Sequence, residues 1–274
     1  MNFSSARQSF YQEINQPDEQ INLAKAALDI AQEEYVDLDL EEYLNALDTM
    51  AAEVLERLPA ERYPMRTIQT INRYLYDDLG FIGNTDDYYD PRNSFLNDVI
   101  DRRTGIPLTL ALVYLEIARR IDFPMVGVGM PGHFLIRPEF EDVGIFVDAF
   151  NRGEILFEQD CKERLAQIYQ QPVELQGNFI APVSSRRFLT RMLTNLKMIY
   201  MNRQDLPKAL STVERILLLF PDAPVELRDR GLLYYQLGRW AEASQDLNIY
   251  LAILPNAEDA PLIRQLLKHL GGDG

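Results

Sequence analysis

Apolar residues recur every three or four positions along the first 80 residues, and turn signals separate the successive runs. Three such runs cover residues 17–34, 39–58 and 64–79. This spacing places apolar side chains on one face of an α-helix. The pattern therefore predicts an all-helical start to the chain.

The next stretch alternates turn residues with apolar runs. Residues 80–93 are rich in Gly, Asp and Asn, which favours a long loop. We expect Ser94 to cap the helix that follows and Gly105 to end it. Pro107 has a fixed φ suited to a first helical turn, and it begins a second helix that runs to Ile121. That helix is apolar on several faces, so we expect it to be buried.

The pattern changes after residue 124. The runs MVGVGM, HFLIRP and GIFVDAF are short and rich in β-branched and aromatic residues, and glycine or Pro-Gly separates them. These features predict a small antiparallel sheet. Helices return at about Glu158. Helices, then strands, then helices indicate an α+β domain rather than a βαβ array, and we place its end near residue 182.

The remaining residues, 183–274, contain an internal repeat. An offset of 34 residues is the period of tetratricopeptide hairpins, and a last helix over residues 260–270 would cap the array. The alternative is a helical bundle whose spacing matches by coincidence. The pairs at this offset are Tyr200 and Tyr234, Ala209 and Ala243, Leu217 and Leu251, Pro221 and Pro255, and Ala223 and Ala257.

Two residues of the predicted sheet could form a chemical site. His133 follows Pro131-Gly132 at the start of one strand run, and Asp148 lies on the next run. Neighbouring strands could bring the imidazole and the carboxylate together. Such a pair can act as a general base and the group that orients it.

This arrangement resembles the transglutaminase-like or papain-like core, in which a cysteine at the start of a buried helix faces a strand histidine and then a strand aspartate. In that superfamily the motif is Gly-x-Cys, with an alanine four residues after the cysteine. Gly105, Pro107 and Ala111 occupy those places here, and His133 and Asp148 match the other two members. The nucleophile position is therefore a proline.

Longer segments are similar to the SirB-type family of bacterial proteins, which have a transglutaminase-like core followed by tetratricopeptide repeats. The resemblance covers nearly the whole chain. It implies the fold class and the order of the domains, and members of that family are described mainly as regulators. The segments are DYYDPRNSFLNDVIDRRTGIPLTLALVYLEIARR, GVGMPGHFLIR and FVDAFNRGEIL.

The proline removes the thiolate that would attack a substrate, so His133 and Asp148 are expected to be a vestigial, non-catalytic pair. Thr109 is a weak substitute because a threonine inside a helix usually bonds a backbone carbonyl. Cys161 lies among carboxylates, which favours a structural role. Water activated by His133 and Asp148 remains the alternative, and it would make the protein a hydrolase or acyl transferase.

Composition narrows the other possibilities. The chain has 42 acidic against 27 basic residues, for a formal charge of -15, which argues against nucleic-acid and anionic-membrane partners. Neither a signal peptide nor a membrane-spanning apolar run is recognisable, so a cytoplasmic location is expected. One cysteine and two histidines give little means to hold a metal, and we expect no cofactor, since no glycine-rich phosphate loop is present.

The predicted function is protein interaction, as a cytoplasmic adaptor or regulator. Tetratricopeptide hairpins would bind the partner, with a candidate surface near Tyr200, Tyr234, Tyr235 and Trp240. The predicted architecture is a transglutaminase-like α+β domain over residues 1–182, mostly helical with a small antiparallel sheet. Residues 183–274 form the all-α repeat domain.

Overall fold

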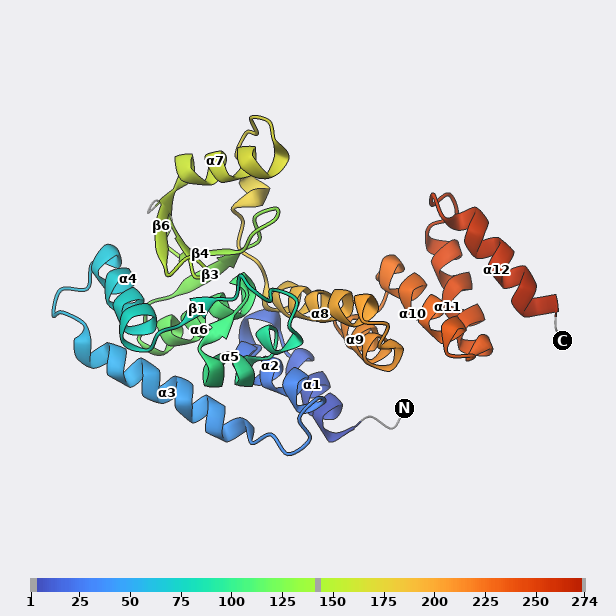
Figure 1. Cartoon of the computed structure of the whole chain (residues 1–274), viewed down its shortest axis with the longest axis horizontal. Helices are drawn as coiled ribbons and strands as arrows, with labels where there is room; N and C mark the ends of the chain where they lie inside the picture. The colour runs from blue at the N-terminus through green and yellow to red at the C-terminus, as the bar shows by residue number, and fades with distance from the viewer. Residues whose placement is uncertain (1–3, 141–143, 273–274) are drawn as a thin grey trace. The chain divides into compact units, whose positions relative to one another are not determined.

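The computed structural model describes residues 4–140 and 144–272, and its chain divides into two compact units (Figure 1). Unit 1 is Met1–Leu189 and unit 2 is Thr190–Gly274. Twelve α-helices and two small sheets lie within the described residues. The predicted α+β class, mostly helical with a small antiparallel sheet and helical hairpins at the end, is confirmed.

Unit 1 contains seven complete α-helices, six strands and four short helical segments in its described part. The helices are α1 (Ser5–Ile14), α2 (Leu23–Gln32), α3 (Leu40–Arg57), α4 (Pro64–Asn72), α5 (Leu96–Arg102), α6 (Pro107–Arg120) and α7 (Glu158–Tyr169). The short segments are η1 (Asp18–Gln20), η2 (Arg73–Asp78), η3 (Pro91–Asn93) and η4 (Gly177–Phe179). The strands are β1 (Ile82–Gly83), β2 (Thr104–Gly105), β3 (Met125–Val128), β4 (Leu135–Pro138), β5 (Ile145–Asp148) and β6 (Glu154–Phe157).

The helical start is divided differently from the predicted runs. The run predicted over 17–34 is broken after η1, because Asn22 begins a new helix by accepting a hydrogen bond from Lys25 N. Likewise, α4 ends at Asn72 and continues as the π-helix η2. Periodicity alone does not separate these segments, since a short turn or a wider helix keeps much of the apolar spacing.

Both predicted ends of the helix α5 are wrong. Ser94 ends the turn of η3 by donating its N–H to Pro91, and Phe95 occupies the N-cap position. The helix ends at Arg102, and the next residue, Arg103, caps it with a left-handed φ of 56°. Gly105 instead pairs with Gly83 in the parallel β1–β2 ladder.

The larger sheet is antiparallel, in the order β3-β4-β5-β6. Its registers pair Met125 with Pro138, Ile136 with Val147, and Ile145 with Phe157. One more strand is present than the three predicted, because β6 runs directly into the helix α7 with no turn residue between them.

Helices cover both sides of this sheet (Figure 1). On one side, α7 contributes Cys161 and Leu165 to a core shared with the strand residues Val128, Phe146 and Leu156. On the other side, α6 packs against β3 and β4. Most of the α6 side chains are buried, as its apolar sequence predicts.

The repeat hairpins are formed by α8 (Ser185–Asn202), α9 (Leu206–Leu219), α10 (Pro224–Gln236) and α11 (Trp240–Ile253), with α12 (Ala260–Gly272) after them. The equivalent residues Ala209 and Ala243 are fully buried. A Cβ atom at Gly231 would lie 2.8 Å from the Leu247 side chain. Small residues therefore let α10 and α11 pack closely, and α12 packs on α11 as the predicted last helix.

Candidate functional site

A tight turn positions His133. Pro131 and Gly132 are its central residues, and His133 N donates a hydrogen bond of 3.1 Å to Met130 O. Gly132 has a φ of +71°, which a Pro-Gly turn of type II requires at its third position. The strand β4 begins only at Leu135, so His133 precedes the strand rather than starting it.

Asp148 is the last residue of β5, where the chain turns toward β6. Its Oδ1 accepts backbone hydrogen bonds from Phe150 N at 3.1 Å and Asn151 N at 3.2 Å. Aspartate often closes a turn in this way. The carboxylate is thereby held in place by its own loop before any other side chain reaches it.

The structure places His133 and Asp148 together. His133 Nε2 lies 2.8 Å from Asp148 Oδ2, and Asn151 Nδ2 donates to the same oxygen at 2.8 Å. Arg164 of α7 bridges that oxygen to Glu154 through its two terminal nitrogens. Asp148 is fully buried, and the His133 side chain is 15% exposed. A basic side chain is therefore part of this site.

The environment keeps Asp148 ionised. Burial by itself raises the pKa of a carboxyl, but hydrogen bonds from His133, Asn151 and Arg164 outweigh it and hold the pKa of Asp148 well below its usual range. An ionised carboxylate only accepts hydrogen bonds, so His133 Nε2 is the donor in this pair. Any proton transfer by His133 would therefore involve its other nitrogen, Nδ1.

Side chains from distant helices hold the loop after Asp148. Asn72 Nδ2 donates to Gly153 O at 2.6 Å, and the Tyr114 hydroxyl donates to Asn72 Oδ1 at 3.0 Å. The Tyr76 hydroxyl donates to Ala149 O at 3.0 Å. Burial raises the pKa of both tyrosines, so both hydroxyls keep their protons. The loop is therefore tied to α4, η2 and α6.

Pro107 is the buried first residue of α6. Thr109, one of the weighed substitutes for a nucleophile, is fully buried and donates its hydroxyl to Asn93 O at 2.6 Å. The Thr109 hydroxyl oxygen in turn accepts a hydrogen bond from Ile106 N at 3.2 Å. Thr109 thus joins the start of α6 to the preceding segment, and its hydroxyl is engaged in that role.

Cys161, the other weighed substitute, is fully buried in the core between α7 and the sheet. Burial raises the pKa of its thiol to about 11. Arg164 opposes this shift, and the Asp160, Glu158 and Asp148 carboxylates add to it. A thiol with this pKa is protonated at neutral pH and is a poor nucleophile. The structural interpretation of Cys161 fits this environment.

Three cavities of unit 1 are lined by residues other than this pair. Their volumes are about 610, 530 and 350 Å³. Within residues 4–140 and 144–272, no group of three or more His, Cys, Asp or Glu side chains could hold a metal ion. The described helices include none that is long and apolar enough to cross a membrane.

Of the four aromatic residues predicted to form the contact surface of the repeats, two are buried and two are exposed. Tyr200 and Tyr234 are 4% and 7% exposed, so their rings belong to the core of unit 2 rather than to a contact surface. Arg239 lies over the Tyr234 ring at 4.2 Å. Tyr235 and Trp240 are 39% and 58% exposed. The candidate surface therefore narrows to these two aromatic residues.

Sequence reasoning missed Asn151 and Arg164. Asn151 lies three residues after Asp148, a spacing that allows an aspartate to receive hydrogen bonds from its own turn. Arg164 lies three residues after Cys161 and four before Ile168, so it shares a face of α7 with these two apolar residues. A single arginine on an otherwise apolar helix face is the signal that could have found it, because such a charge requires a partner.

Family comparisons agree with this arrangement of two modules. A transglutaminase-like superfamily model matches residues 41–194, and a tetratricopeptide repeat model matches residues 196–268. The fold and these matches define a transglutaminase-like protein with C-terminal tetratricopeptide repeats. The chain belongs to the UPF0162 protein family within the transglutaminase-like superfamily.

Individual relatives show how far the similarity extends. A UPF0162 protein of Xylella fastidiosa (strain 9a5c) is 38% identical over 264 residues, which cover 93% of this chain and 92% of that protein. UPF0162 protein PA3419 of Pseudomonas aeruginosa is 32% identical over 216 residues, which cover 78% of each chain. F-box only protein 21 of Homo sapiens is 32% identical over 190 residues, or 65% of this chain and 29% of that protein. No solved structure matches.

Proposed function

We propose that this chain is a non-catalytic interaction protein, a cytoplasmic adaptor or regulator of the SirB type. Its repeats bind a protein partner, and its transglutaminase-like domain keeps a vestigial His133–Asp148 pair without a nucleophile. The observation that carries this proposal is the ion pair between Arg164 and the Asp148 carboxylate, which engages the oxygen that also faces His133. The presence of tetratricopeptide repeats supports an interaction role.

The charge of Arg164 opposes catalysis by the pair. A histidine that acts as a general base becomes positively charged, and a neighbouring carboxylate stabilises that charge. Here the same Asp148 oxygen already accepts a hydrogen bond from a guanidinium, which offsets the carboxylate charge. The guanidinium also adds a positive charge beside the imidazole. The arrangement is better suited to hold the loop than to move protons.

The start of α6 supports the same conclusion. A helix N-terminus is where a thiolate would be stabilised, but Pro107 has no reactive group. Thr109 and Cys161 are both buried, the first in hydrogen bonds and the second in the core. On this proposal, the site that a cysteine would occupy in the superfamily serves only to begin the helix.

The interaction surface is assigned to unit 2. Trp240 is the first residue of α11 and Tyr235 lies near the end of α10, with both side chains exposed. Tyrosine and tryptophan are enriched where proteins bind one another because each buries a large area at low conformational cost. We propose that these two residues contact the partner.

One observation favours a second function. His133 Nε2 lies 2.8 Å from Asp148 Oδ2, so a proton taken from water by this imidazole would go to Nδ1. The protein would then be a hydrolase or acyl transferase that works without a protein nucleophile. This alternative requires His133 to be reached by substrate.

A turnover assay separates the two functions. The purified full chain and its His133→Ala variant are incubated with amide and ester substrates, and product is followed by mass spectrometry. The proposal expects the same background rate from both proteins. Hydrolysis by the wild-type chain that disappears in His133→Ala would establish the alternative.

A further inference from the structure

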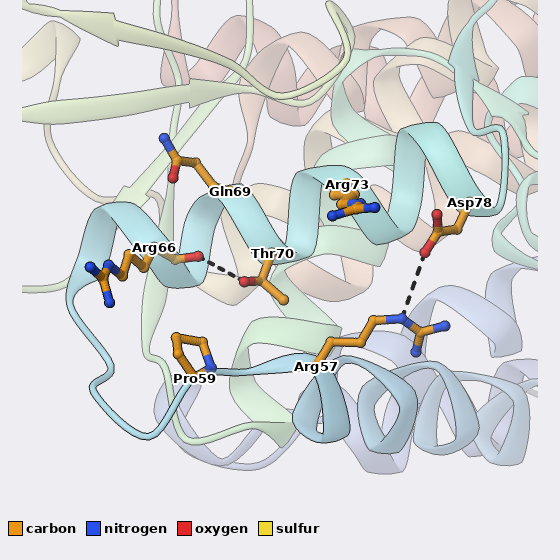
Figure 2. Close-up of a pocket in the computed structure, with 7 residues that line it drawn as sticks. All are labelled: Arg57, Pro59, Arg66, Gln69, Thr70, Arg73 and Asp78. Carbon is orange, nitrogen blue, oxygen red and sulfur yellow. Dashed lines mark hydrogen bonds and ion pairs between the residues drawn. The ribbon is translucent and has the colours of Figure 1, made fainter.

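A basic pocket on unit 1 lies apart from the His133–Asp148 pair. Figure 2 shows it between the C-terminal end of α3 and the helix formed by α4 and η2. Its volume is about 610 Å³. The lining residues are Arg57, Pro59, Arg66, Gln69, Thr70, Arg73 and Asp78. None of them belongs to the site described above, and the proposed function does not use them.

Helical spacing explains why the polar side chains gather here. Arg66, Thr70 and Arg73 are spaced by four and three residues, so they lie along one face of α4 and the start of η2. In the π-helix η2, backbone hydrogen bonds join residues five apart, so Arg73 and Asp78 are separated by roughly one turn. Asp78 is therefore brought to the same side as Arg73, five positions earlier, and faces Arg57 across the pocket (Figure 2).

Two of the three arginines have no carboxylate partner among the residues that the structure describes. Arg66 and Arg73 are exposed, and neither forms an ion pair there. The guanidinium of Arg66 lies 5.9 Å from the Tyr63 ring centroid. Both are exposed donors on the wall of a pocket.

Arg57 is held in place by contacts at the exposed surface. Its Nη1 donates a hydrogen bond to Glu53 O at 2.5 Å. Its guanidinium lies 4.7 Å from the Tyr74 ring centroid, 3.5 Å from the Glu53 carboxylate and 3.6 Å from the Asp78 carboxylate. Ion pairs of this length between exposed side chains contribute little to stability. Arg57 can therefore turn toward a stronger acceptor without a large loss of folding free energy.

The charge of the pocket selects the kind of ligand. Three arginines and one aspartate give the lining a net charge of +2, in a chain whose net charge is -15. A phosphomonoester carries a charge of about -1.5 to -2 at pH 7 and three acceptor oxygens. A carboxylate or a phosphodiester carries a charge of only about -1. Guanidinium groups match the oxygens of a phosphoryl group with paired N–H donors.

We propose that this pocket binds the phosphoryl group of a phosphomonoester, through Arg57, Arg66 and Arg73. The Thr70 hydroxyl, which now donates to Arg66 O at 2.9 Å, and the Gln69 amide lie on the same wall and provide further polar contacts. The volume exceeds that of a phosphate group, so it also holds part of the molecule that carries the phosphate. That molecule is either a small organic phosphate or a phosphorylated side chain.

Calorimetric titration of the full chain tests the proposal. The probes are inorganic phosphate, O-phosphoserine and a short peptide that contains phosphoserine. We expect saturable binding that weakens as the salt concentration rises. The double variant Arg66→Gln, Arg73→Gln should bind about a hundredfold more weakly, since each of the two charged hydrogen bonds contributes about a factor of ten.

The matched control is the double variant Arg62→Gln, Arg187→Gln. It removes the same charge from two exposed arginines that do not line the pocket. It should bind like the wild-type chain, and circular dichroism should show that both variants are folded. Tighter binding of the peptide than of O-phosphoserine identifies a protein as the source of the phosphate, and equal affinities identify a small molecule. Absence of saturable binding by all three probes, or equal weakening in both double variants, overturns the proposal.

Discussion

Five hydrogen-bond donors converge on the Asp148 carboxylate. They are the Phe150 and Asn151 backbone amides, the Asn151 side chain, His133 and Arg164. A buried carboxylate with this many donors is satisfied without taking a proton. Its chemistry is therefore that of a fixed acceptor that orients its neighbours, and His133 is one of several groups it orients.

The acid sensitivity of the fold should depend on Asp148. Its pKa is lower in the folded chain than in the unfolded one, so it stabilises the fold above pH ~4 and loses that effect as the pH falls through the folded-state pKa. Asp148→Asn should lower the free energy of unfolding at pH 7 by about 3 kcal/mol. It should also flatten the fall in stability below pH ~4. Urea unfolding across this pH range measures both effects.

Asp77→Asn is the control, because this exposed aspartate pairs only at the surface with Arg152. It should change the free energy of unfolding by less than about 0.5 kcal/mol. A variant Asp148→Asn that is as stable as the wild-type chain at pH 7 would contradict the structural role assigned to this carboxylate.

Asp29 in α2 has the opposite effect on stability. It is 1% exposed, and within the described residues neither of its oxygens accepts a hydrogen bond of good geometry. Burial raises its pKa to about 6, although the nearby Ser9 hydroxyl and Lys25 oppose the shift. A raised pKa means that the folded chain binds the proton more tightly. The stabilising effect is then present below pH ~4 and is lost as the pH rises through about 6.

Asp29→Asn should therefore stabilise the protein at pH 7, by up to about 3 kcal/mol. Between pH ~4 and 6, urea unfolding should show a falling stability for the wild-type chain and a flatter profile for the variant. Asp37→Asn, at an exposed position, is the control. Identical pH profiles for Asp29→Asn and the wild-type chain would refute this account of Asp29.

At the scale of elements, sequence periodicity predicts long segments better than their ends. The helices α3 and α6, the strands β3 to β5 and the repeat hairpins follow from apolar spacing and from the 34-residue offset. The strand β6 and the π-helix η2 do not, because β6 runs directly into α7 with no turn residue between them and a wider helical turn keeps much of the apolar spacing of an α-helix. The boundary predicted at residues 182 and 183 stays a prediction.

The candidate site was predictable only in part. The spacing of His133 and Asp148 on neighbouring strand runs indicates that the two side chains could meet, and they lie at hydrogen-bonding distance. Arg164 comes from a helix that follows, and no local pattern shows which way that helix packs on the sheet. Tyr200 and Tyr234 were predicted near the contact surface but are buried, because helical spacing does not tell which aromatic side chains a neighbouring helix covers.

The turn between β5 and β6 should tolerate no side chain at Gly153. This glycine has a φ of +71°, and a Cβ atom there would lie 2.1 Å from Asn72 Oδ1. Gly153→Ala should strain the turn and separate it from Asn72, which costs about 2 kcal/mol or more in stability. Thermal unfolding followed by circular dichroism measures the change. Gly177→Ala, where a Cβ atom meets nothing within 4 Å, should have a melting temperature close to that of the wild-type chain.

At the scale of the whole molecule, two modules with different chemistry share one chain. Unit 1 contains the His133–Asp148 pair and the basic pocket, and unit 2 presents Tyr235 and Trp240. If the transglutaminase-like domain were catalytic, the functional consequences of mutation would concentrate at His133. If the protein is an interaction module, they concentrate on the exposed aromatic residues of the repeats.

Affinity capture from a bacterial lysate tests this distinction most directly. The baits are the full chain, the variant Tyr235→Ala, Trp240→Ala, and the variant His133→Ala, Asp148→Asn, each checked for folding by circular dichroism. We predict that a specific partner is captured by the wild-type chain and by the His133, Asp148 variant but is lost with the aromatic variant. A partner that is retained by the aromatic variant and lost with the His133, Asp148 variant would contradict the account.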